Sequence, residues 1–176
     1  MKRTKTYKMV WSGVFVALGI VLPFLTGQIQ GIGKMLLPMH IPVLLCGFVC
    51  GAPYGLAVGL IVPLLRSVLF GMPVLFPTAV SMAFELAVYG CVTGILYRRL
   101  PKKNYMIYIA LLGAMIAGRV VAGVANMILY GVQGEGYSLQ MFMAGMFLNA
   151  VPGIVLQLVL IPVIVMLLGR AKIVDK

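Results

Sequence analysis

Long runs of apolar residues, separated only by short polar segments, dominate this sequence. A helix that crosses a membrane needs about 20 mostly apolar residues, at about 1.5 Å of rise per residue. Runs of roughly this length cover residues 9–25, 35–52, 54–70, 77–97, 105–130 and 141–168. The sequence therefore predicts an all-α integral membrane bundle of six transmembrane helices, in which residues 1–176 form a single domain.

The composition excludes the main alternatives to a membrane bundle. The chain is 62% hydrophobic and only 10% charged, whereas soluble domains contain about 25% charged residues. A water-soluble globule could not cover its surface with so few polar residues, and intrinsic disorder is excluded for the same reason. The alternating pattern of a membrane β-barrel is absent from the sequence.

The basic residues indicate how the bundle is oriented. They gather in three clusters, over residues 2–8, 98–103 and 170–176, and positive charges at membrane ends favour the cytoplasm. All three clusters lie on one side only if Pro53 separates the second and third runs into two helices. Both termini are then expected in the cytoplasm, and the net charge of +11 sets orientation and does not indicate a nucleic-acid partner.

The first run resembles a signal peptide, because basic residues precede an apolar stretch. The residues that follow it, Thr26-Gly27-Gln28, do not form an A-x-A-like cleavage site. We therefore expect a retained first span. Gly13 and Ala17 give this span a small-x-x-x-small face, which suits either internal packing or contact with a partner membrane protein.

Three ionisable residues, Arg66, Glu85 and Arg119, lie well within the predicted spans. Such residues are costly in a bilayer and are functional candidates by default. Helical spacing places Glu85 and Arg119 on two polar stripes that must face the bundle interior, because lipid cannot satisfy them. One stripe contains Ser81, Glu85 and Tyr89, and the other contains Arg119, Asn126 and Tyr130.

These stripes and the polar residues near the outer ends of neighbouring helices form the candidate site. Its members are His40, Arg66, Glu85, Tyr89, Arg119, Asn126, Tyr130 and Asn149. They could line a cavity open to the outside, where two arginines and one glutamate leave a positive charge for a carboxylate or phosphate. A neutral polar ligand is an alternative. So is a purely structural Glu85–Arg119 ion pair, since buried charges usually pair.

The sequence carries no enzyme motif. The segment Gly31-Ile-Gly33-Lys34-Met35 lacks the glycine spacing of a phosphate loop and its Ser or Thr. Cys46, Cys50 and Cys91 have the spacing of neither a metal site nor a redox motif, so we interpret them as core residues. We therefore expect no catalytic residue, no metal, no cofactor and no ATP hydrolysis by this chain itself.

Several short motifs resemble the substrate-binding S components of energy-coupling factor (ECF) transporters. They include Pro38-Met39-His40-Ile41-Pro42-Val43, Gly71-Met72-Pro73 and Glu85-Leu86-Ala87-Val88-Tyr89-Gly90. Glycines at Gly47, Gly51, Gly55 and Gly59, followed by Pro63-Leu64-Leu65, add to the resemblance. It extends over residues 8–168, and its subgroup looks most like the pantothenate or pyridoxine transporters.

This resemblance implies a function in vitamin uptake. S components bind a vitamin or precursor with high affinity and dock on a membrane T component and two cytoplasmic ATPase subunits, in the plasma membrane of bacteria. The family's Ala-x-x-x-Ala contact with the T component corresponds to Gly13 and Ala17 here. Pantothenate is slightly favoured because the spare arginine suits its carboxylate, and pyridoxine or hydroxymethylpyrimidine come next. A stand-alone carrier or channel is the alternative, although the inverted repeats of such proteins are not evident.

Overall fold

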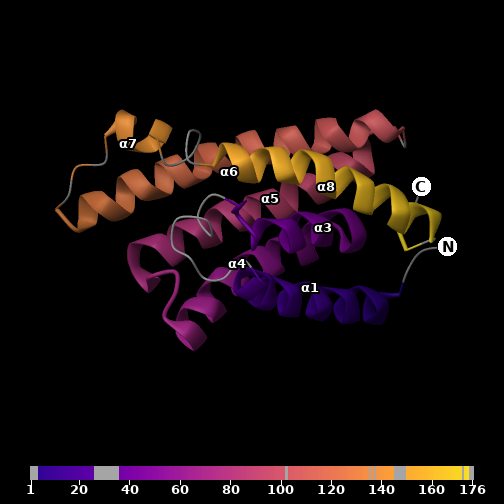
Figure 1. The fold of residues 1–176 in the computed structure, drawn as a ribbon, viewed down its shortest axis with the longest axis horizontal. Coiled ribbons are helices and arrows are strands. Elements are labelled where there is room, and N and C mark those ends of the chain that lie inside the picture. The colour runs from indigo at the N-terminus through magenta and orange to yellow at the C-terminus, as the bar shows by residue number, and fades with distance from the viewer. Residues whose placement is uncertain are drawn as a thin grey trace.

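The computed structural model describes residues 4–25, 36–101, 103–134, 136, 138–144, 150–171 and 173–174. Within these residues the chain is helical and contains no strand. The helices are α1 (Lys5–Leu25), α3 (His40–Cys50), α4 (Ala52–Phe70), α5 (Val80–Arg99), α6 (Asn104–Val132), α7 (Leu139–Met143) and α8 (Val151–Arg170), and the π-helical turn η1 (Leu75–Ala79) leads into α5 (Figure 1).

Five described helical segments are long and apolar enough to cross a membrane, namely α1, α4, α5 with η1, α6 and α8. Their outward faces carry exposed large apolar side chains, such as Val10, Val68, Ile116 and Val159. This arrangement is unfavourable in water and favourable in lipid. The prediction of an all-helical membrane protein is confirmed, while the count of six crossings stays a prediction.

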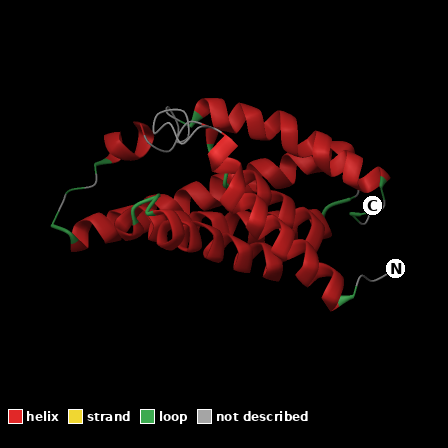
Figure 2. Ribbon diagram, turned by 60° about the horizontal axis from the view of Figure 1, so that its bottom comes forward, coloured by secondary structure: helices red, strands yellow, loops and turns green. Residues whose placement is uncertain are grey.

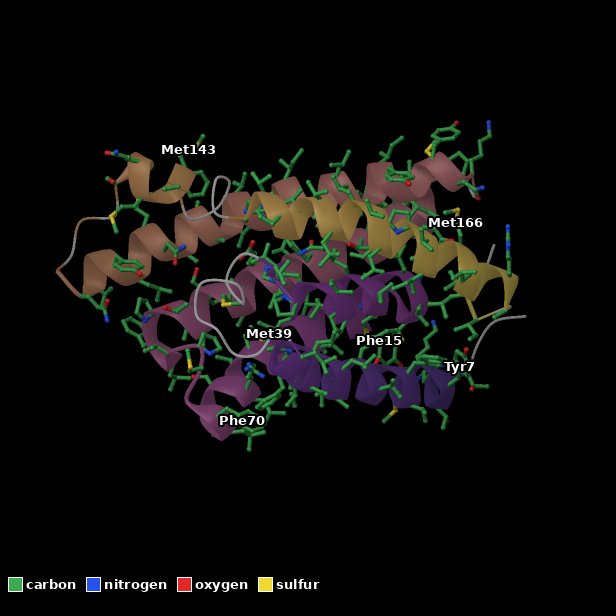
Figure 3. The ribbon with its side chains drawn as sticks, viewed as in Figure 1. Tyr7, Phe15, Met39, Phe70, Met143 and Met166 are labelled. Atoms are coloured by element: carbon green, nitrogen blue, oxygen red, sulfur yellow. The ribbon has the colours of Figure 1, made fainter. Side chains whose placement is uncertain are left out.

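The long helices run along a common direction in both views of the ribbon (Figures 1 and 2). Helix α3 lies among them and contacts α1, α4, α5 and α8. Each of its 11 residues is buried, as expected for a helix that is apolar on every side. Tyr7 on α1 and Met166 on α8 lie toward one end of the molecule, and Phe70 and Met143 lie toward the other (Figure 3).

The second predicted helix, over residues 35–52, is shorter than expected. Helix α3 begins only at His40, and residues 26–35 lie outside the described part of the chain. Leu37 adopts a positive φ of 49°, and the following Pro38 cannot donate a backbone hydrogen bond. Pro42 is tolerated because it lies in the first turn of α3, where backbone N–H groups have no partner within the helix. An 11-residue helix spans about 16 Å.

Gly51 separates α3 from α4, which confirms two helices where a single kinked one was the alternative. Its φ is 92°, a conformation that favours glycine. A Cβ atom at this position would collide with the guanidinium of Arg98, which donates from Nη2 to the Cys50 carbonyl at 3.1 Å. Pro53 then lies in the first turn of α4, where proline is well accommodated.

The last predicted helix, over residues 141–168, corresponds to two described helices, with residues 145–149 outside the described part of the chain. The chain forms the short helix α7 and then α8, which has Pro152 in its first turn. A proline within a helix removes a hydrogen bond and clashes with the preceding turn, so α8 begins where Pro152 fits. The other four predicted helices agree with α1, α4, α5 and α6 to within a few residues.

Small residues bring α4 and α5 into backbone contact. A Cβ atom on Gly90 would lie 2.8 Å from the Gly55 Cα atom, and a Cβ atom on Gly59 would meet the backbone of Leu86. Close approach of this kind is typical of membrane helices, where packing replaces the hydrophobic effect. It fixes the part of α5 that carries Glu85 against α4.

Candidate functional site

The polar stripe of α5 faces the interior of the bundle, as its spacing predicts. Ser81, Glu85 and Tyr89 are 3%, 5% and 0% exposed. The three residues follow one another at intervals of four, so they lie on one face of the helix. The rest of this face is formed by small residues such as Gly90, which leaves the polar side chains between α5 and its neighbours.

His40 approaches this stripe from the first turn of α3. Its Nε2 atom lies 3.8 Å from Glu85 Oε1, and its ring packs edge-to-face on the Tyr89 ring with centroids 5.4 Å apart. His40 is 2% exposed. The start of α3 next to Pro38 therefore delivers an imidazole to a buried carboxylate, a contact that the sequence alone did not define.

Arg119 reaches the same group from α6. It is 4% exposed and interacts electrostatically with both Glu85 and Tyr89. Gly118 makes this approach possible, because a Cβ atom there would collide with the Tyr89 ring. The expectation that both stripes turn toward the bundle interior agrees with the burial of Glu85, Tyr89 and Arg119, whereas their role in a ligand site stays a prediction. We call these three residues and His40 the buried cluster.

Several buried polar atoms make no hydrogen bond to any described residue. They are His40 Nδ1, the Tyr89 hydroxyl and both amide atoms of Gln157. Unpaired buried groups cost about 1–3 kcal/mol each and are uncommon in native proteins. Gln157, on α8, is 0% exposed. It was not among the predicted site residues, although a lone amide in an apolar helix is the signal that marks it.

Arg66 lies in different surroundings from those expected. Its Nη1 atom donates to the Ile20 carbonyl of α1 at 2.7 Å. Its guanidinium lies over the rings of Phe24 and Phe70, 4.9 and 5.7 Å from their centroids. These contacts connect α4 to the end of α1, and they give Arg66 partners other than the buried cluster.

The remaining predicted residues differ in placement. Asn126 is buried on α6, one stripe position beyond Arg119, and Tyr130 is half-buried further along the same helix. Asn149 lies outside the described residues. Among the residues that the structure describes, no group of three or more His, Cys, Asp and Glu side chains could hold a metal ion.

Gly13 and Ala17 lie on the exposed face of α1. A Cβ atom on Gly13 would meet nothing within 4 Å, whereas one on Gly19 would lie 2.7 Å from a Val62 methyl group. Gly19 therefore serves packing inside the bundle. Of the two uses that the small-residue face allowed, internal packing does not account for Gly13.

A helical bundle with apolar outer faces and buried ionisable groups defines a polytopic membrane protein. Residues 7–165 match the family described as ECF transporter, substrate-specific component. The chain belongs to this family, whose members are substrate-binding subunits of transporters and not enzymes. No curated protein and no solved structure matches the chain.

Proposed function

We propose that this chain is the substrate-specific subunit of an ATP-driven ECF transporter in a bacterial plasma membrane. It binds a water-soluble vitamin or precursor from the outside, and a T component and two ATPase subunits drive its release inward. The observation that carries this proposal is the buried cluster. Three helices supply ionisable and hydrogen-bonding groups whose exposed fractions are at most 5%, within a family of substrate-binding subunits.

The proposed ligand site comprises the buried cluster, Asn126 and Tyr130 further along α6, and Asn149. Arg66 is left out of this proposed site, because its guanidinium has partners on α1. The candidate substrates are those of the related subgroup. They differ in charge, since pantothenate is an anion at neutral pH and pyridoxine and hydroxymethylpyrimidine carry no net charge.

The direct test is calorimetry of the purified chain against a panel of B vitamins. We expect tight binding of one of them, and a more than tenfold loss in Glu85→Ala or Arg119→Ala, which corresponds to about 1.4 kcal/mol. Arg99→Ala is the matched control, because this arginine is exposed at the end of α5. Absence of binding to the whole panel, or equal binding by all three variants, would contradict the proposal.

The proposed docking surface for the T component is the exposed face around Gly13 and Ala17. Gly13→Leu adds bulk where the described chain has open space, so folding and vitamin binding should persist. Co-purification with the T component should be lost, because small residues allow close helix contact. Val120→Phe, on the exposed face of α6, should retain it. Normal assembly of Gly13→Leu would argue for a different docking face.

The alternative is a stand-alone carrier or channel. Liposomes that contain this chain alone would then take up the vitamin, whereas an S component in the same liposomes binds without sustained transport. Uptake of radiolabelled vitamin, measured with and without the T component and ATPases, separates the two functions.

A further inference from the structure

The carboxylate of Glu85 already has basic partners within the buried cluster, His40 and Arg119. Glu85 contributes one negative charge, and Arg119 contributes one positive charge that interacts with it. His40 adds its Nε2 atom, 3.8 Å from the same carboxylate. An anionic ligand placed here would meet a carboxylate whose countercharges are already engaged, and a buried charge without compensation is costly.

Arg66 is engaged in contacts outside the buried cluster. Its guanidinium donates to the Ile20 carbonyl at 2.7 Å and is covered by Phe24 and Phe70. These contacts hold the guanidinium beside the end of α1. The other charged residues expected in the outer loops, Lys34 and Glu135, are of opposite sign and lie outside the described residues.

The buried atoms without a hydrogen-bond partner, on His40, Tyr89 and Gln157, match a hydrogen-bonding ligand and not a charged one. With the proton of His40 on Nε2, facing Glu85, its Nδ1 atom is an acceptor. The Tyr89 hydroxyl and the Gln157 amide can each donate and accept. A ligand that offers hydroxyl or N–H donors together with a neutral acceptor matches these groups.

We propose that the site takes an uncharged, hydrogen-bonding ligand, such as a hydroxylated nitrogen heterocycle, in preference to a carboxylate or phosphate. This proposal rests on the proposed function. It reverses the slight preference for pantothenate, which depended on counting Arg66 as a spare charge at the ligand.

The experiment compares the affinities of matched neutral and anionic compounds for the full-length chain in detergent. The pairs are pantothenol and pantothenate, pyridoxine and 4-pyridoxate, and nicotinamide and nicotinate, measured by calorimetry beside the B-vitamin panel. In any matched pair that binds, the neutral compound should bind at least tenfold tighter than the anionic one. The best-binding neutral vitamin of the panel should exceed the best-binding anionic vitamin by the same factor. An anion that binds as tightly or more tightly overturns the charge proposal and leaves the proposed function intact. Absence of all binding overturns the proposed function and the charge proposal with it.

Two variants test where the charge selectivity arises. Glu85→Gln leaves Arg119 without its carboxylate, so the neutral-to-anion affinity ratio should fall at least tenfold. Arg66→Gln should change the neutral-to-anion affinity ratio by no more than about twofold. On the same scale, a tenfold change in affinity corresponds to about 1.4 kcal/mol. A selective loss of anion binding in Arg66→Gln would place this arginine at the ligand and refute the proposal.

Discussion

Gln157 is the residue whose chemistry fits its surroundings least well. It is 0% exposed, and neither amide atom makes a hydrogen bond to a described residue. A buried amide without partners lowers stability. His40 Nδ1 and the Tyr89 hydroxyl are in the same state. Together these atoms favour a site that completes its hydrogen bonds only when a ligand is bound.

Replacing Gln157 by leucine should therefore separate stability from binding. Gln157→Leu removes two unpaired polar atoms at similar volume, so the unfolding temperature without ligand should stay the same or rise. Vitamin affinity should fall at least tenfold, or about 1.4 kcal/mol. Both quantities are measured on the purified chain by thermal unfolding and calorimetry.

Thr93→Val is the matched control, because the Thr93 hydroxyl donates to the Tyr89 carbonyl at 2.6 Å and is already paired. It should bring no gain in stability. A lower unfolding temperature for Gln157→Leu with unchanged affinity would assign Gln157 a structural role.

At the scale of elements, the contact between α4 and α5 has the least spare room. A Cβ atom on Gly90 would collide with the backbone of Gly55. Two rigid backbones cannot give way as a flexible side chain can, so even one methyl group forces the helices apart. The positions of Glu85 and Tyr89 depend on this contact, because both residues lie on the same stretch of α5.

We expect Gly90→Ala to destabilise the bundle by about 1–3 kcal/mol, the usual cost of overpacking. Gly13→Ala is the control, since it meets open space and alanine is the better helix former. Thermal unfolding in detergent should show a lower midpoint for the first variant and an equal or higher one for the second. Equal midpoints would mean that the two helices can separate without penalty.

Arg66 adds a polar contact between α1 and α4 to the close packing of Gly19 on Val62. Arg66→Gln removes the hydrogen bond to Ile20 and the stacking on Phe24, which should cost about 1–3 kcal/mol. Arg99→Gln, at an exposed position on α5, should cost much less. Thermal midpoints of the two variants check this expectation, and equal values would show that α1 is held by apolar packing alone.

At the scale of the whole molecule, the residues near the start of α1 and near the end of α8 lie at the same end of the bundle (Figure 3). An even number of membrane crossings places both ends of the chain on the same side. Six crossings with both termini in the cytoplasm is one such arrangement. The short helix α3 is enclosed by its neighbours. It therefore needs no lipid-facing surface of its own.

Cysteine labelling tests the orientation. Gly136→Cys should react with a membrane-impermeant maleimide in intact cells, because residues 131–140 connect the fifth and sixth predicted spans on the side opposite the basic clusters. Arg99→Cys should react only after the membrane is opened, since basic clusters favour the cytoplasm. The reverse pattern would mean that the bundle is inserted the other way.

The sequence by itself determined that the chain is an all-helical membrane protein and which faces of α5 and α6 turn inward. In lipid every backbone polar group must be satisfied within a helix, so apolar length alone marks most spans. The cost of buried charge likewise selected Glu85 and Arg119, and Gly51 with Pro53 marked the end of α3 and the start of α4.

Only the tertiary structure decided which polar groups meet. Arg66 and Ile20 are 46 residues apart, and the contact between His40 and Glu85 joins α3 to α5. Helical periodicity gives the direction of a side chain but not the neighbour that it meets. For that reason the sequence counted Arg66 as a free charge and omitted Gln157, while the packed bundle engages the first and leaves the second without a partner among the described residues.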